Sequence, residues 1–393
     1  MQYRTNQKNG DELSVLGFGC MRFTKNGNTI DQEKAEREMK KALDLGVNYF
    51  DTAYLYNGSE ECLGKFMEHY DCRDKLKIAT KLPQYYIRKI EDADRYFDEE
   101  LRRLKTDYVD YYLLHMLNDP ASFKRLSDLG IREWIENKKT KGQIRNIGFS
   151  FHGGTVRFKE LIDSYDWDFA QVQFNYVDEH SQAGIEGIKH AHEKGIPIII
   201  MEPLRGGRLV NNLPGKAVEE FNNMSPLRTP ADWGLRWIWD HKEVNVVLSG
   251  MNDVAQVEEN ARIASEATAG SLTKDEHAFY KRVLSAINES IKVGCTGCGY
   301  CQPCPQGVDI PGCFSAYNHS YTDKYMVALK EYLMCTTLRK DKTNASRCIE
   351  CGKCEQHCPQ SIQIRKELKN VQKRMENPIY KIAAWGMRLV MKY

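Results

Sequence analysis

The stretch VNYFDTAYLY, residues 47–56, combines a short apolar run with an acid and a phenol at its end. Tyr49 and Phe50 are typical of a buried strand, and that strand would end at Asp51. Tyr56 follows in the next loop. A carboxylate and a phenol at the end of a strand suit proton transfer, so this stretch predicts a reactive site as well as a strand.

Similar apolar runs alternate with helical patterns such as EKAEREMKKALDLG, which has an apolar stripe and a terminal glycine. The eight runs predicted as strands are 15–18, 47–51, 76–81, 109–115, 144–150, 169–175, 196–202 and 245–249. This alternation predicts an α/β protein with a closed (β/α)8 TIM barrel, and an open doubly wound sheet is the alternative. The absence of a GxGxxG motif after the first strand weakens that alternative.

Three segments lie outside the strand–helix repeat. Residues 203–229 are rich in Gly, Pro and Asn and are predicted as a long functional connection after the seventh strand. Residues 273–291 are predicted as an extra helix that leads out of the barrel. After residue 293, two cysteine runs flank a helical stretch near 324–339, which indicates a separate small module.

Composition excludes some classes of partner. The chain has 56 Lys and Arg against 54 Asp and Glu, a formal net charge of +2, so no nucleic-acid partner is expected. The N-terminus lacks the apolar segment of a secretory signal, and no apolar run is long enough to span a bilayer. These features predict a cytoplasmic protein without a transmembrane segment. In that reducing compartment, clustered cysteines indicate metal ligation rather than disulfides.

Polar residues end three successive predicted strands, namely Asp51, Lys81 and His115. Active sites of (β/α)8 barrels lie at the C-terminal ends of the strands. Taken singly, the three have structural explanations: a capping carboxylate, a solvated strand end and a core histidine. Together with Tyr56 they form a coherent set, because an ammonium lowers the pKa of a neighbouring phenol and a carboxylate holds the ammonium. The histidine can orient a substrate oxygen, so the set suits reduction of a carbonyl.

Several motifs in order resemble the aldo-keto reductases over roughly residues 1–290: LGFGCMR, DTAYLYNGSEECLG, IATK, DYYLLH, GFSFHG, AQVQFN and LSGMNDVAQVEEN. The resemblance implies a nicotinamide-dependent oxidoreductase on a TIM barrel. The family's catalytic tetrad would fall on Asp51, Tyr56, Lys81 and His115, with the tyrosine as general acid.

The same resemblance implies a nicotinamide site. Contacts to the carboxamide would fall on Ser150 and Gln171. The pyrophosphate loop would comprise Leu204, Gly206, Gly207 and Leu209, and the adenosine side would comprise Ser249, Met251, Asn252, Gln256, Glu259 and Asn260.

This chain also departs from the family pattern. Phe151 follows the serine, and Met201 stands where an aromatic usually stacks on nicotinamide. Gly250 and Gln256 replace basic residues that many members use for a 2′-phosphate. NADH and NADPH therefore both stay open, with Arg205 or Arg208 as the alternative cation.

The cysteine runs have the spacing of ferredoxins. The second run, Cys348, Cys351, Cys354 and Cys358, has gaps of two, two and three residues and is followed by proline, as in bacterial two-cluster ferredoxins. The first run, Cys295, Cys298, Cys301 and Cys304, is one residue shorter before its last cysteine. The spacing favours two [4Fe-4S] clusters, and a pair of structural zinc sites is the alternative.

The runs resemble the α-helical type of two-cluster ferredoxin domain. This resemblance implies that Cys295, Cys298, Cys301 and Cys358 hold one cluster and that Cys348, Cys351, Cys354 and Cys304 hold the other. Cys313 is the alternative to Cys304, and Cys335 is predicted to pack on the insert helix. The predicted domains are a barrel (1–290), a small, mainly helical ferredoxin-like domain (291–370) and a tail (371–393) that packs on the body. The tail is apolar and basic by turns, which favours docking on the barrel, and a membrane-surface helix is the alternative.

The combination predicts an oxidoreductase that reduces a carbonyl or conjugated carbonyl while the clusters exchange electrons with ferredoxin or another donor. Hydride moves as an electron pair and clusters pass single electrons, so a flavin, or a substrate able to form a radical, would have to divide the pair. One alternative is an electron-transfer or redox-sensing protein with the barrel as scaffold. Another is an ordinary NAD(P)H carbonyl reductase with structural clusters.

Overall fold

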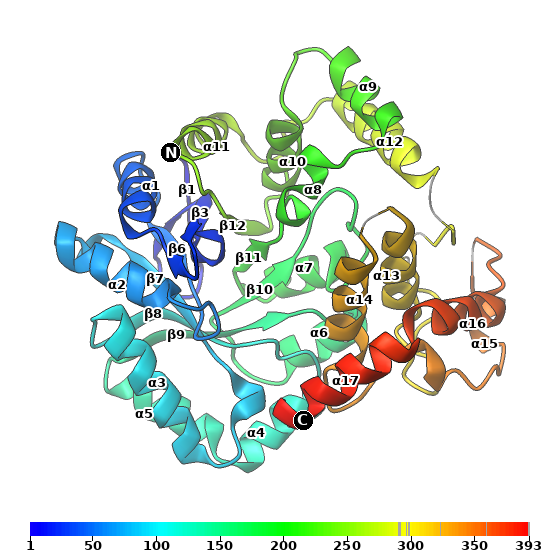
Figure 1. Cartoon of the computed structure of the whole chain (residues 1–393), viewed down its shortest axis with the longest axis horizontal. Coiled ribbons are helices and arrows are strands. Elements are labelled where there is room, and N and C mark those ends of the chain that lie inside the picture. The colour runs from blue at the N-terminus through cyan, green and yellow to red at the C-terminus, as the bar shows by residue number, and fades with distance from the viewer. Residues whose placement is uncertain (290–291, 296, 298, 323, 359, 392–393) are drawn as a thin grey trace.

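The computed structural model describes residues 1–289, 292–295, 297, 299–322, 324–358 and 360–391, and its centre is a closed barrel of eight parallel strands (Figure 1). The strands are β3 (Leu16–Gly19), β6 (Tyr49–Asp51), β7 (Lys77–Leu82), β8 (Val109–Leu114), β9 (Ile144–Phe151), β10 (Phe169–Gln173), β11 (Ile198–Met201) and β12 (Val244–Ser249). Each predicted strand is confirmed, and β12 pairs with β3 to close the ring. The open-sheet alternative is wrong.

Helices surround the barrel. They are α1 (Gln32–Asp44), α2 (Ser59–Tyr70), α3 (Ile90–Leu104), α4 (Pro120–Asp128), α5 (Ile131–Thr140), α6 (Thr155–Asp163), α7 (Gly184–Glu193), α10 (Pro230–Trp239) and α11 (Val254–Glu266). In α1, the side chain of Asp31 accepts a hydrogen bond from the Lys34 amide and so caps the helix. The predicted apolar stripe of α1 is buried at Ala35, Met39 and Ala42, which fixes the helix against the barrel.

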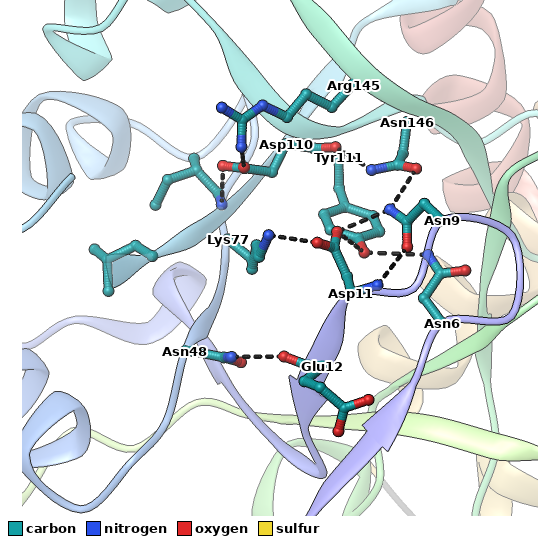
Figure 2. A network of polar contacts seen from close by, with 12 residues as sticks. Asn6, Asn9, Asp11, Glu12, Asn48, Lys77, Asp110, Tyr111, Arg145 and Asn146 are labelled. Carbon is teal, nitrogen blue, oxygen red and sulfur yellow. Dashed lines mark hydrogen bonds and ion pairs between the residues drawn. The ribbon is translucent and has the colours of Figure 1, made fainter. Parts of the chain in front are cut away.

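A hairpin of β1 (Tyr3–Thr5) and β2 (Glu12–Ser14) closes the N-terminal end of the barrel. Figure 2 shows the polar network that fixes it: the Tyr111 hydroxyl donates to Asp11 at 2.9 Å, and Lys77 pairs with the same carboxylate. Above the network, the rings of Tyr49 and Tyr111 pack edge to face in the barrel interior, with centroids 5.1 Å apart. A filled interior and a closed base leave the opposite end of the barrel for the site.

The long connection after β11 contains short helices that the sequence did not predict: η4 (Arg205–Gly207), α8 (Arg208–Asn211) and α9 (Gly215–Asn223). The predicted extra helix is confirmed as α12 (Lys274–Asn288). It packs on α9, where the ring centroids of Phe221 and Phe279 lie 5.2 Å apart. The connection is therefore an ordered layer rather than an open loop.

The C-terminal module is mainly helical. Its elements are α13 (Ile310–Thr322), α14 (Tyr325–Tyr332), the π-helix η5 (Leu333–Thr337), η6 (Ala345–Arg347), α15 (Lys353–Gln356) and α16 (Ile364–Met375). The sequence predicted one helix near 324–339 and missed α13, which ends at Thr322. Two barrel residues, Tyr85 and Met116, belong to the module's hydrophobic core. They follow β7 and β8, so the module packs on the C-terminal end of the barrel.

The chain continues into α17 (Pro378–Val390), which packs on η5 of the module. The predicted docking on the barrel is therefore replaced by docking on the module. α16 runs through residue 371, so the predicted division between module and tail falls inside a helix. Among the residues that the structure describes, no helix is long and apolar enough to cross a membrane.

Candidate active site

The four predicted catalytic side chains lie together at the C-terminal end of the barrel. Nζ of Lys81 lies 2.6 Å from Oδ1 of Asp51 and donates a second hydrogen bond of 2.6 Å to the Thr52 carbonyl. The ring centroid of Tyr56 lies 5.0 Å from this ammonium and 6.2 Å from the ring of His115. Strand neighbours explain the grouping, because β6, β7 and β8 are adjacent in the barrel.

Burial and the charge of Lys81 act on the pKa of Tyr56 in opposite directions. Burial raises the pKa of Tyr56 above its usual value, and the Lys81 ammonium opposes this shift without cancelling it. The predicted effect of the ammonium is therefore present, but the burial effect is larger. Tyr56 stays protonated at neutral pH, which is the form a proton donor needs.

The pKa values of Asp51, Lys81 and His115 are also shifted by their surroundings. Burial raises the pKa of Asp51, opposed by Lys81 and Gln171. The pKa of Lys81 is raised, because Asp51 and Tyr56 outweigh its burial. Burial, followed by the charges of Lys81 and His152, lowers the pKa of His115 well below its usual value. His115 is thus a neutral imidazole at neutral pH.

The two predicted nicotinamide contacts are neighbours across β9 and β10, where Gln171 pairs in register with Ser150. Oγ of Ser150 accepts a hydrogen bond of 2.8 Å from the Met116 amide, which fixes the side chain. In the described part of the chain, Oε1 of Gln171 and Nδ1 of His115 are buried without a hydrogen-bond partner. Such groups are costly unless a ligand satisfies them, so the barrel mouth fits an amide and a carbonyl oxygen.

The predicted pyrophosphate loop forms a tight turn at η4. Gly206 and Gly207 have φ of 66° and 88°, a conformation that glycine adopts without strain. The guanidinium of Arg22 covers this turn, since a Cβ on Gly206 would lie 2.6 Å from its Nη2. The stem of Arg22 also lies against Gly250. Arg22 was missed as a site residue, although it ends the LGFGCMR motif.

The predicted adenosine-side residues lie at the end of β12, in the loop that follows and in the first half of α11. The side-chain amide of Asn260 donates to Oγ of Ser249 at 3.1 Å, and the backbone amide of Asn252 donates to Oε1 of Gln256 at 3.3 Å. Met251 is buried, and a carboxylate oxygen of Glu259 accepts a hydrogen bond from the hydroxyl of Thr229.

Arg205 is engaged with the C-terminal module instead of standing free for a phosphate. Its guanidinium pairs with Asp178 at 2.9 Å and contacts the imidazole of His319 on α13. His319 in turn pairs with Glu331 of α14, whose pKa falls to about 2 because the pull of the nearby cations outweighs its burial. Arg205 thus joins barrel to module, and the guanidinium that lies over the turn at Gly206 is that of Arg22.

A second contact places the module beside the catalytic groups. Nη2 of Arg339, which follows η5, donates to the His152 carbonyl of the barrel at 3.4 Å. Tyr85 and Met116, which follow β7 and β8, pack in the module's hydrophobic core. The module therefore lies at the catalytic end of the barrel.

Of the seven described cysteines in the two predicted sets, six lie near other members of their set, and Cys351 is exposed. Cys295, Cys301 and Cys358 line one pocket, which Phe314 and Ile364 complete on its apolar side. Cys298 lies outside the described residues. The second set gathers around Cys354: burial raises its thiol pKa to about 11, followed by the effects of Glu355, Cys348 and Cys304.

The remaining cysteines have other surroundings. Cys313 is buried and its thiol faces the Thr343 carbonyl at 3.7 Å. Cys335 is buried in η5, and Cys351 is exposed. Within the described ranges, no three or more His, Cys, Asp or Glu side chains converge to hold a metal ion. Thiols around a pocket fit a cluster, in which each iron has its own thiolate, better than one zinc ion.

Comparison with known proteins agrees with this division. Residues 15–279 match the model of the aldo/keto reductase family, which covers more than half of the chain. The chain belongs to the aldo/keto reductase family. Residues 294–362 match the model of the 4Fe-4S dicluster domain, so this family member carries an iron-sulfur domain at its C-terminal side and the zinc alternative is not supported.

Relatives of the barrel include L-galactose dehydrogenase from Arabidopsis thaliana, 26% identical over 303 residues, which cover 72% of this chain and 93% of that protein. Among solved structures, the holo form of the aldo-keto reductase AKR11C1 from Bacillus halodurans is 28% identical, with a TM-score of 0.60 over 72% of this chain and 96% of that one. An aldo-keto reductase from Klebsiella pneumoniae, solved with NADPH, is 22% identical with a TM-score of 0.59 over 72% of this chain and 96% of that one; it supports the fold.

Proposed function

We propose that the barrel reduces a carbonyl or conjugated carbonyl with a nicotinamide cofactor and with Tyr56 as the proton donor. The observation that carries this proposal is the buried Asp51–Lys81 pair beside Tyr56 and His115. The pair keeps a positive charge next to a phenol that is otherwise hard to ionise. This is the arrangement needed when the phenol loses its proton only during the reaction.

The reduction of a simple carbonyl balances as follows. When bound, a nicotinamide would supply hydride to the carbonyl carbon. The Tyr56 hydroxyl gives its proton to the carbonyl oxygen, so an alcohol and the oxidised nicotinamide are formed. Lys81 stabilises the phenolate left on Tyr56 until it regains a proton from water. A neutral His115 hydrogen-bonds the same substrate oxygen and fixes its position.

The chain's own residues fit this cofactor. Gln171 and Ser150 hold the carboxamide, the turn at Gly206 and Gly207 lets the backbone approach phosphates, and Arg22 supplies a positive charge. That charge favours NADPH. A relative from Schizosaccharomyces pombe, 25% identical over 224 residues, is named as an NADP(+) aldo-keto reductase, which supports the same choice.

The iron-sulfur domain has a separate role in this proposal. The two predicted cysteine sets would hold two [4Fe-4S] clusters, which would supply single-electron exchange with ferredoxin or another donor. Because hydride carries two electrons, this exchange would require a flavin or a substrate able to form a radical, and it would be a route separate from direct hydride transfer to a simple carbonyl. Support comes from the contact of Arg339 with the His152 carbonyl, and from Tyr85 and Met116, which pack in the module core at the catalytic end of the barrel.

Anaerobic purification, followed by a visible spectrum, an iron count and identification of released cofactors, tests this assignment. We expect a brown protein that takes up NADPH and whose clusters change oxidation state during turnover. Clusters that are reversibly oxidised and reduced while the barrel binds neither nicotinamide nor flavin would contradict the proposed reduction. That result would favour an electron-transfer or sensing protein. Carbonyl reduction that persists after cluster removal would favour structural clusters.

A further inference from the structure

The last helix, α17, uses only one of its faces to pack on the protein. Tyr380 and Ala384 are buried in the module core, and the Tyr380 hydroxyl lies 3.0 Å from that of Thr337. Arg388 donates to the Thr337 carbonyl at 3.4 Å. These contacts hold α17 as a rigid element, so the orientation of its other face is fixed.

The other face is apolar and exposed. Its side chains are Ile379, Ile382, Trp385 and Leu389, exposed by 50%, 71%, 66% and 60%. They follow one another at intervals of three, three and four residues, which places them in one stripe of the helix. Single exposed apolar residues are ordinary, but a contiguous stripe of four large ones marks an interaction surface.

The charges around the stripe are positive. Residues 377–393 contain no Asp or Glu, and Lys381 and Arg388 lie along one border of the apolar stripe. Burial, then Arg388 and Arg347, lower the pKa of Lys342 on the module, and the buried Glu376 opposes them. Arg388 itself contacts the module at the Thr337 carbonyl, so Lys381 is the exposed cation of this border.

This combination selects one kind of partner. A second copy of the chain that paired through the stripe would bring the two sets of cations together, which costs free energy. An anionic lipid surface instead accepts both the apolar stripe and the cations, and tryptophan favours the interface between lipid and water. The helix has 13 residues, so it lies in the plane of the surface and does not cross it.

We propose that α17 docks the protein on an anionic membrane surface, with Ile382 and Trp385 inserted at the level of the lipid headgroups. The proposal is independent of the reaction in the barrel. If α17 acts as an amphipathic surface helix, vesicle binding requires both anionic lipid and the apolar stripe, and it weakens as the salt concentration rises.

Flotation of the full-length, anaerobically purified protein tests this with vesicles of phosphatidylcholine, alone or mixed with phosphatidylglycerol. We expect binding only to the mixed vesicles. The double variant I382Q/W385Q should show an at least tenfold lower bound fraction, because each of its two substitutions removes an inserted apolar side chain. K381Q should weaken binding and make it less sensitive to salt. L227Q changes a residue that is 77% exposed but far along the chain from α17, and should bind like the parent protein.

Tryptophan quenching gives an independent readout. Trp385 is 66% exposed, whereas the other five tryptophans are at most 7% exposed, so acrylamide reports mainly on Trp385. Mixed vesicles should shield it. No vesicle binding, or equal binding by I382Q/W385Q, would overturn the proposal. So would a dimer in sedimentation velocity that the same double variant dissociates, because the stripe would then be an interface between copies.

Discussion

The ammonium of Lys81 lies 2.6 Å from Oδ1 of Asp51, and the two side chains are 1% and 5% exposed. A buried ion pair of this kind has a fixed geometry, because either charge alone would be strongly unfavourable there. The ammonium is thereby held beside Tyr56 in every turnover. Its effect on the phenol is smaller than that of burial in the protein alone, and it becomes decisive only when Tyr56 loses its proton.

The pH dependence of carbonyl reduction follows from these shifts. Tyr56 is a donor below its pKa, which lies above the ordinary value of about 10. His115 is neutral above its pKa, which lies well below the ordinary value of about 6.5. We predict that kcat/KM for reduction is constant from mildly acidic pH to about pH 9 and falls only at higher pH.

A pH profile of kcat/KM with saturating NADPH checks this. An acidic limb near the ordinary histidine pKa that disappears in His115→Gln would show that His115 titrates in the working range, against the prediction. A change in protein stability would affect all substrates equally, so two unrelated aldehydes serve as the control.

Replacing Arg22 should weaken phosphate binding. Arg22→Gln removes the guanidinium that covers the turn at Gly206. We expect the Kd for NADPH to rise by about 10- to 100-fold, because a hydrogen bond to a charged group contributes about 1.5–3 kcal/mol. Fluorescence titration at low salt measures this. Arg37→Gln, on the exposed side of α1, is the matched control; equal Kd values for both variants would exclude Arg22 from the cofactor site.

The two candidate fourth ligands of the second cluster can be separated by substitution. Cys304 lies beside Cys348 and Cys354, whereas Cys313 faces the Thr343 carbonyl. We predict that Cys304→Ala loses one of two clusters, so that the iron count falls by about half. Cys313→Ala should keep the full iron count. Iron loss in Cys313→Ala with retention in Cys304→Ala would reverse the assignment.

Glu38 on α1 should make the protein less stable at alkaline pH. Both of its carboxylate oxygens are buried without a hydrogen-bond partner among the described residues, and burial raises its pKa to about 7. The folded state therefore keeps the proton that the unfolded state releases above about pH 4.3. The free energy of unfolding falls as pH rises to about 7 and stays lowered above it, by roughly 1–3 kcal/mol.

Glu38→Gln should remove this loss, so it should raise the free energy of unfolding at pH 8 and change it little at pH 4. Urea unfolding at both pH values measures the difference. Glu33→Gln on the exposed face of the same helix is the control. A stabilisation of Glu38→Gln that is equal at the two pH values would show that the carboxyl does not titrate as predicted.

Much of the barrel could be predicted from the sequence, because a buried parallel strand leaves a continuous apolar run. The ends of β6, β7 and β8 also revealed Asp51, Lys81 and His115, since adjacent strands bring their ends together. The helix α13 could not be predicted in this way, because its sequence mixes apolar and polar residues without a clear apolar face. It buries Asn318 and His319, because the module folds against the barrel.

Residues whose role depends on distant parts of the chain were harder to predict. Arg22 approaches Gly206 and Gly250 across the barrel mouth, and Arg205 turns toward His319 on the module. Neither contact has a local signature in the sequence. The raised pKa of Tyr56 was not predictable either, because the sequence showed its charged neighbour but not how deeply the phenol is buried. Domain boundaries, the two-cluster count and the cytoplasmic location stay predictions.

The most direct test of Tyr56 as the proton donor in carbonyl reduction is a deuterium-transfer assay. NADPH dideuterated at C4 is supplied with an aromatic aldehyde, and the deuterium in the alcohol product is measured by mass spectrometry. Tyr56→Phe should lower this transfer by about 10²- to 10⁴-fold and leave the Kd for NADPH unchanged, because the phenol gives the proton and not the binding. Tyr54→Phe, a neighbouring phenol that packs on Tyr96, should transfer deuterium like the parent protein. Equal transfer by Tyr56→Phe and the parent protein would contradict the account.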